Sequence, residues 1–127
     1  MIEIVGNPKY RRVYISGPIT GILNYNIAEF KKYEEKFKNL NFEVVNPHEL
    51  FTKEEVDGIN KSLEDKVISF EEHHAFFMRR DIKEMMDCDF IAVLNGWEKS
   101  KGANIEVYVA RNLNIPVIDA VTLNELF

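Results

Sequence analysis

The chain has 127 residues, of which 46% are hydrophobic and 29% are charged. This length suits one domain with a real core, and the composition is typical of a globular protein rather than a disordered or fibrous one. The net charge of −5 argues against a general nucleic-acid binder, which would carry a basic face. The single cysteine, Cys88, excludes an internal disulfide.

Two kinds of targeting signal are missing from the sequence. No apolar run approaches the roughly 18 residues that a membrane-spanning helix needs. The first residues also lack the basic-then-apolar pattern of a signal peptide. We therefore expect one domain over residues 1–127, in the cytoplasm, with no membrane partner and no nucleic-acid polymer as partner.

Apolar periodicity predicts alternating strands and helices along the chain. Strands are expected at 12–16, 42–45, 89–94 and 116–119, and helices at 27–39, 74–87 and 103–112, with a short helical C-terminus. Asn24 or Asn26 is expected to cap the first helix. Residues 48–70 are charged and weakly periodic, with a short helix near Glu54 and a break at Gly58, and we interpret them as an excursion or lid.

This order of elements predicts an α/β fold, an open parallel sheet flanked by helices on both faces in a Rossmann-like or flavodoxin-like sandwich. Ligands of such sheets bind beyond the carboxyl ends of the strands. Three segments are expected to meet there: 16–21, 46–48 and 95–102. None of them is a dinucleotide fingerprint or a P-loop, but a glycine loop and a helix N-terminus could hold an anion.

Two carboxylates point where apolar side chains are expected. At about 100° per residue, Asp81 projects at roughly 40° from Phe77, inside the apolar stripe of its helix. Glu106 falls inside the arc predicted for Ile105, Val109, Ala110 and Leu113 in the next helix. A buried carboxylate is costly unless it is paired, hydrogen-bonded or protonated, so such positions are candidate active-site positions.

Structural roles are the alternative for both residues. Asp81 could pair with a buried arginine, and Glu106 could cap the N-terminus of its helix, where the dipole favours an anion. Two such residues on either side of one strand favour a functional interpretation. Trp97 could stack on a base or simply cover the sheet. His73 and His74 match no zinc spacing, so no metal and no cofactor are expected.

Three stretches of the chain resemble the nucleoside 2-deoxyribosyltransferase superfamily, which includes the 2'-deoxynucleoside 5'-phosphate N-hydrolases. They are V-Y-I-S-G-P-I-T-G, R-R-D-I-K-E-M-M-D-C-D-F-I-A-V-L and W-E-K-S-K-G-A-N-I-E-V-Y-V-A. The resemblance implies that Glu106 is a nucleophile, that Asp81 is the acid assisting departure of the base, and that Tyr14 lies beside them. The resemblance also singles out Gly17, Asp89 and Ser100. Together with the three segments at the carboxyl edge of the sheet, it leads us to expect a substrate-binding role for Ser16, Gly17, Ile19, Asn46, Asp89, Trp97, Ser100 and Gly102. Within that set, Ser100 matches a phosphate-contacting serine, and Asp89 matches a residue that supports the site's structure.

These features predict an enzyme that cleaves or transfers at the N-glycosidic bond of 2'-deoxyribonucleosides or their 5'-monophosphates. The partner is then a small deoxynucleoside or deoxynucleotide. The alternative is a catalytically silent nucleotide-binding or protein-interaction module on the same fold. Exposed aromatic side chains and the resemblance together lead us to expect a homo-oligomer, a dimer or higher.

Overall fold

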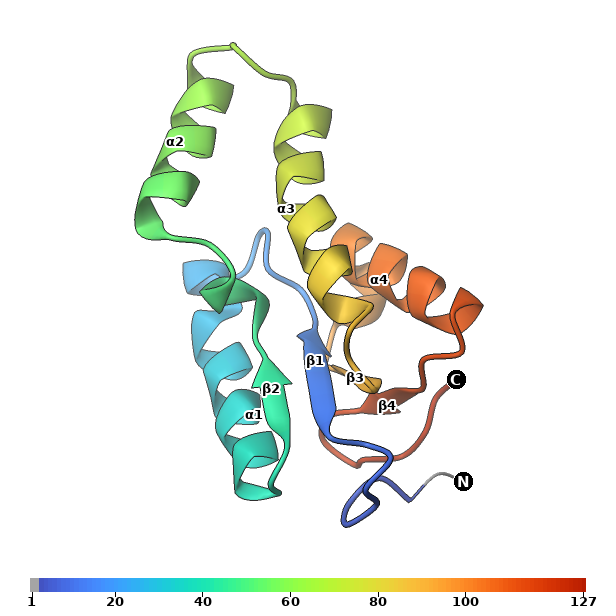
Figure 1. Ribbon diagram of the computed structural model, residues 1–127. Helices are drawn as coiled ribbons and strands as arrows, with labels where there is room; N and C mark the ends of the chain where they lie inside the picture. The colour runs from blue at the N-terminus through green and yellow to red at the C-terminus, as the bar shows by residue number, and fades with distance from the viewer. Residues whose placement is uncertain (1–2) are drawn as a thin grey trace.

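A computed structural model describes residues 3–127 and contains one four-stranded parallel sheet (Figure 1). The strand order is β2-β1-β3-β4, and every neighbouring pair is parallel. The strands are β1 Arg12–Ser16, β2 Glu43–Val45, β3 Phe90–Val93 and β4 Val117–Asp119. The predicted open parallel sheet is therefore confirmed.

Helices cover both faces of this sheet (Figure 1). The bounds are α1 Ile27–Asn39, α2 Lys53–Glu64, α3 Phe70–Met85 and α4 Lys101–Asn112, with short 3-10 turns η1 Leu23–Asn26, η2 Pro47–Glu49 and η3 Trp97–Lys99. Alternate residues of β1 point to opposite faces, as the period of a strand requires. Val13 and Ile15 pack in the core under α1, whereas Tyr14 packs in the core under α3 and α4.

The strand order places a topological switch point between β1 and β3. The chain runs from β1 outward to β2 and then returns across the sheet to β3, on the other side of β1. Open α/β sheets bind their ligands at such a point, beyond the carboxyl ends of the strands. The carboxyl end of β1, at Ser16, is therefore the place to look for a site.

The predicted excursion at 48–70 is largely helical. α2 runs through Gly58 without a break, because a capping box between Thr52 and Glu55 fixes its start and one glycine costs only about 1 kcal/mol. α3 begins at Phe70 rather than at His74, since a second capping box precedes it. The predicted helix break was wrong.

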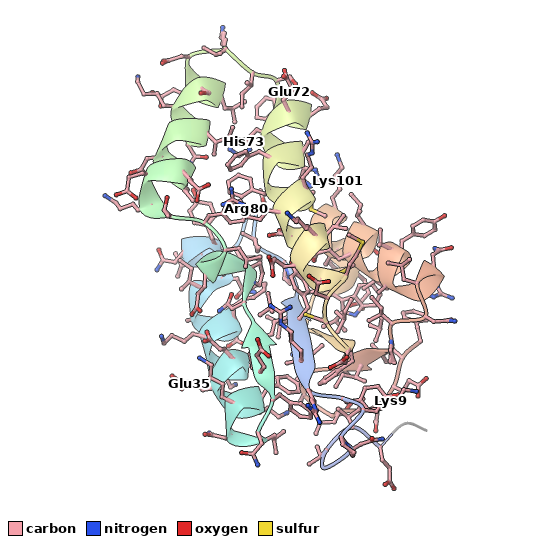
Figure 2. The ribbon with its side chains drawn as sticks, viewed as in Figure 1. Lys9, Glu35, Glu72, His73, Arg80 and Lys101 are labelled. Atoms are coloured by element: carbon pink, nitrogen blue, oxygen red, sulfur yellow. The ribbon has the colours of Figure 1, made fainter. Side chains whose placement is uncertain are left out.

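α2 and the N-terminal half of α3 form an arm that projects beyond the rest of the molecule (Figures 1 and 2). Arg80 fixes its base, with a guanidinium nitrogen 2.6 Å from the Glu55 carboxylate and another donating to the Leu50 carbonyl at 2.9 Å. The same guanidinium lies 4.6 Å from the centre of the Phe51 ring.

Among residues 3–127, no helix has both the length and the apolar surface to span a membrane.

The predictions for the ends of two elements were only partly right. Asn26 occupies the N-cap position of α1, but its backbone is left-handed, at φ 61°, and its side-chain amide donates to the Pro18 carbonyl instead of its side chain capping the helix. The C-terminus is extended rather than helical, and Glu125 pairs antiparallel with Ile118. These last residues satisfy the outer edge of β4, which a helix would leave open.

Candidate functional site

The side chains of Tyr14 and Ser16 project from the same face of β1 at the switch point. Both residues are fully buried. The Tyr14 hydroxyl donates to Glu106 Oε2 at 2.6 Å, and the Ser16 hydroxyl donates to Glu106 Oε1 at 2.7 Å. Each oxygen of the Glu106 carboxylate therefore has its own short hydrogen bond from the sheet.

Glu106 lies at one edge of the buried face of α4. That face consists of Ala103, Glu106, Val107 and Ala110, whereas Leu113, predicted as part of it, is 50% exposed. The true apolar arc is thus rotated away from Leu113 but still contains Glu106, which is only 5% exposed. Ser100 caps the helix, so Glu106 lies beyond the first turn, where the dipole has faded. Tyr14 and Ser16, rather than the helix end, stabilise its ionised form.

Asp81 reaches the same region from α3 and is 6% exposed, as the helical periodicity predicted. Its environment differs from that of Glu106 in one decisive respect. Asp81 Oδ1 is buried and accepts no hydrogen bond within the described residues. A buried carboxylate oxygen without a donor strongly favours the protonated, neutral form.

Burial and hydrogen bonding give the two carboxyl groups different protonation states. Burial raises the pKa of Asp81 to about 8, with a further increase from the negative charge of Glu106, while Arg80 opposes both. Burial also raises the pKa of Glu106 to about 7, but the hydrogen bonds from Tyr14 and Ser16 work against it. Because only Glu106 has donors for both oxygens, we assign the first ionisation to Glu106 and the retained proton to Asp81.

The Tyr14 hydroxyl remains a donor across the physiological pH range. Burial raises its pKa well above the ordinary value, and the nearby charges of Glu106 and Asp81 raise it further. A neutral phenol facing a carboxylate donates a short, charge-assisted hydrogen bond. The three side chains thus form one coupled unit of a phenol, a carboxylate and a carboxylic acid.

Gly17 and Ile19 shape the loop beside this unit. A Cβ on Gly17 would lie 2.9 Å from Leu94 Cβ, so only glycine lets the end of β1 pass this closely to β3. Ile19 is half-buried and packs against the core under α1. Both residues therefore have a packing role at the carboxyl edge of the sheet.

Ser100 and Gly102 lie at the start of α4. The Ser100 hydroxyl accepts from the Ala103 amide at 3.2 Å and so caps the helix, while its own proton is left free to donate. A Cβ on Gly102 would lie 3.3 Å from the sulfur of Met78, so this glycine permits close packing of α3 on α4. The structure gives both residues local roles, and their contacts with a ligand stay a prediction.

Asn46 stands at the carboxyl end of β2, but its side chain is already used. Its amide donates to Glu34 Oε1 at 3.1 Å, and its carbonyl oxygen accepts from the His48 amide at 3.0 Å. These bonds hold the loop after β2 in place. The structure thus makes Asn46 a residue that positions this loop.

Asp89 and Trp97 are not brought to the carboxyl pair. Asp89 lies at the amino edge of the sheet, where its carboxylate accepts from the Arg11 and Arg12 amides at 2.9 Å each. These contacts support the start of β1, at the edge of the sheet opposite the site, rather than the site itself. Trp97 is half-buried and packs edge-on against Phe127, with ring centres 6.2 Å apart, which favours the covering role.

Sequence reasoning missed a third buried carboxylate, Glu34 on α1. It is 4% exposed, and Lys38 and Asn46 both donate to it, Lys38 at 2.6 Å. Although burial opposes the effect, hydrogen bonds from Lys38, Asn46 and Glu49 lower its pKa. The i,i+4 Glu-Lys spacing was a signal in the sequence, but one shared with ordinary exposed pairs.

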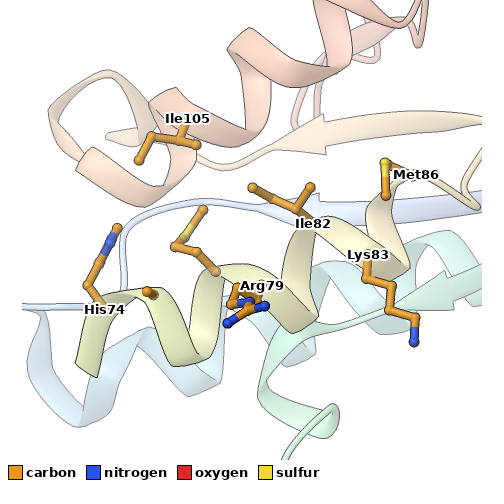
Figure 3. A pocket seen from close by; sticks show the side chains of 8 residues that line it. His74, Arg79, Ile82, Lys83, Met86 and Ile105 are labelled. Carbon is orange, nitrogen blue, oxygen red and sulfur yellow. The ribbon is translucent and has the colours of Figure 1, made fainter. Parts of the chain in front are cut away.

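Other reactive groups stand apart from the pair. Cys88 is buried, and burial raises the pKa of its thiol to about 12, so it is a core residue and a poor nucleophile. Within residues 3–127 no three His, Cys, Asp or Glu side chains gather as metal ligands. A groove of about 450 Å³ opens between α3 and α4, but Asp81 and Glu106 do not line it (Figure 3).

The comparisons with known proteins give a family without an assigned activity. No curated protein matches the chain. A family model described as "Domain of unknown function (DUF4406)" matches residues 11–119, a span that contains all four strands and all four helices. On the strength of that match, the chain belongs to the DUF4406 family.

Proposed function

We propose that this protein is an enzyme that cleaves or transfers at the N-glycosidic bond of 2'-deoxyribonucleosides or their 5'-monophosphates. One observation carries the proposal: a hydrogen-bonded carboxylate, Glu106, and an undonated carboxyl, Asp81, are buried together at the switch point. The sequence resemblance to the nucleoside 2-deoxyribosyltransferase superfamily supports the same activity. The two arguments are independent, because burial and hydrogen bonding do not enter the resemblance.

The proposed reaction divides acid and nucleophile between the two residues. Glu106, as the carboxylate, attacks C1' of the sugar while the bond from C1' to the base nitrogen breaks through an oxocarbenium-like state. Asp81 donates its proton to the departing base. Water, or a second base, then attacks C1' and displaces Glu106, and Asp81 takes a proton back from the attacking group. Water gives a hydrolase and a second base gives a transferase.

The pKa order suits these roles. An acid is most effective when its pKa lies near the working pH, and the Asp81 pKa of about 8 keeps most of it protonated at neutral pH. Tyr14 and Ser16 hold the Glu106 carboxylate in one orientation. In this mechanism Tyr14 orients the nucleophile through its hydrogen bond and transfers no proton.

A phosphate subsite at the start of α4 is part of the proposal for the 5'-monophosphates. Ser100 has a free hydroxyl proton, and Lys99 and Lys101 flank it on the exposed surface. Backbone amides at a helix N-terminus favour an anion. We further propose a cytoplasmic location, a small deoxynucleoside or deoxynucleotide as the partner, and catalysis without a cofactor.

One observation favours the alternative, a catalytically silent binding module on the same fold. Asp81 and Glu106 are only 6% and 5% exposed, and the open grooves along α3 are lined by other residues. The pair is therefore closed to a substrate in this conformation. A module that never opens would keep the pair as a structural hydrogen-bonded cluster.

The test is release of free base from a panel of deoxynucleosides and their 5'-monophosphates, with and without a second base. We expect wild type to release or exchange base, and Glu106→Gln to lower the rate by at least about 10²-fold. Glu98→Gln is the matched control, because Glu98 is exposed and precedes α4. Nucleotide binding without base release by any of the three proteins would establish the silent module instead.

A further inference from the structure

The exposed side of α3 carries a ridge of residues spaced four apart: Glu71, Ala75, Arg79 and Lys83. All four are exposed to solvent. Residues four apart lie one above another on a helix, so the ridge runs from an acid through a small residue to two bases. Within residues 3–127, the three charged members make no ion pair with their own chain.

Grooves flank this ridge on both sides. The groove toward α4, of about 450 Å³, has an apolar floor formed by Met78, Ile82, Met86 and Ile105 (Figure 3). The groove toward α2, of about 700 Å³, is lined partly by Ile59, Ile68 and Phe76. Ala75, Arg79 and Lys83 line both grooves. Helices pack by inserting the ridges of one into the grooves of the other, so this surface can receive a second helix.

The charge order makes the ridge complementary to itself. When a second α3 lies antiparallel with its Lys83 facing Glu71, the same register places Arg79 opposite Ala75 and Glu71 opposite Lys83. The small Ala75 side chain leaves room for the long guanidinium, which can reach the acidic first turn of the facing helix, where Glu71 and Glu72 lie. Opposite charges then meet at both ends of the pair, as a two-fold axis requires.

We propose that α3 pairs antiparallel with α3 of a second copy of this chain, through the ridge Glu71-Ala75-Arg79-Lys83. The projecting N-terminal half of each α3 then lies beside the C-terminal half of the other, over the apolar floor between α3 and α4. Met86, which is 50% exposed in one copy, is covered in this arrangement. The inference does not depend on the proposed enzymatic activity.

Charge exchange tests the pairing by sedimentation velocity over a range of concentrations. We expect wild type to dimerise, and Glu71→Lys or Lys83→Glu to weaken dimerisation about tenfold or more, because like charges then meet twice. The double variant Glu71→Lys with Lys83→Glu restores the homodimer. An equimolar mixture of the two single variants forms a heterodimer, since every facing pair is again opposite in sign.

Two controls keep the outcomes distinct. Lys31→Glu makes the same charge change on exposed α1, on the other face of the sheet, and leaves dimerisation unchanged. Circular dichroism shows that each variant is folded.

A monomeric wild type overturns the proposal and leaves the α3 ridge to a different partner. A dimer that tolerates both single variants, or a double variant that stays monomeric, places the interface elsewhere.

Discussion

Replacing Asp81 by asparagine changes how stability depends on pH. The Asp81 carboxyl has a pKa of about 8 in the folded protein, against an ordinary value of 3.8. At a pH between these two pKa values, the folded state holds a proton that the unfolded state has released. The free energy of unfolding therefore falls as the pH rises. The asparagine side chain does not titrate. The part of the fall in stability with pH that is due to Asp81 is therefore absent from the variant.

The magnitude follows from one proton per molecule. Each pH unit inside the window costs the wild type about 1.4 kcal/mol relative to the variant. From pH 5 to pH 7 the stability of Asp81→Asn relative to wild type therefore rises by about 3 kcal/mol. The buried amide adds a roughly constant cost of about 1–3 kcal/mol, because its donors also lack partners. We thus expect the variant to gain stability relative to wild type at every step from pH 5 to pH 7, and to be the more stable protein near pH 8.

Urea unfolding at pH 5, 6, 7 and 8 measures this difference, with the fluorescence of the single tryptophan, Trp97, as the signal. Asp87→Asn makes the same chemical change at an exposed carboxyl and serves as the control. Glu106 is present in every protein, so its own titration largely cancels. Parallel curves for wild type and Asp81→Asn would refute the assignment of a retained proton to Asp81.

Three further changes probe other contacts. Tyr14→Phe removes a donor to the Glu106 carboxylate, so we expect the Glu106 pKa to rise above about 7, as ¹³C carboxyl titration can measure. Gly58→Ala is expected to stabilise the protein by about 0.5–1 kcal/mol in thermal unfolding, because a Cβ there meets nothing within 4 Å and the position is inside a helix. Arg80→Ala removes the ion pair to Glu55, and faster amide hydrogen exchange in α2 with unchanged exchange in the sheet is the expected result.

The sheet and the two inward carboxylates could be predicted because strong periodic signals specify them. The β1 side chains alternate strictly between two cores, and Asp81 interrupts an apolar stripe at an angle that helical geometry fixes. Glu106 was found through an arc that proved to be rotated. The inference held because both arcs, the expected and the observed, contain that residue.

Contacts between segments distant in the chain could not be read from local patterns. Nothing near Glu106 in sequence indicates that Tyr14 and Ser16 will donate to it, because the packing of α4 on the sheet brings them together across 92 and 90 residues. The partner of Arg80 is likewise 25 residues away, at Glu55, and only the packing of α2 on α3 makes this arginine an anchor. The Gly58 break failed for a related reason: a capping box outweighed the cost of one glycine.

The extended C-terminal residues have a consequence for self-association through the sheet. β4 is an edge strand, and edge strands offer unpaired amides and carbonyls to other chains. Here the Val117 and Asp119 amides donate to the Phe127 and Asn124 carbonyls at 3.1 and 2.9 Å. The Val117 carbonyl in turn accepts from the Leu126 amide at 2.7 Å. Residues 124–127 thus protect the β4 edge from pairing with a strand of another molecule. Removing them would leave backbone amides and carbonyls of β4 unpaired and open to edge-to-edge aggregation.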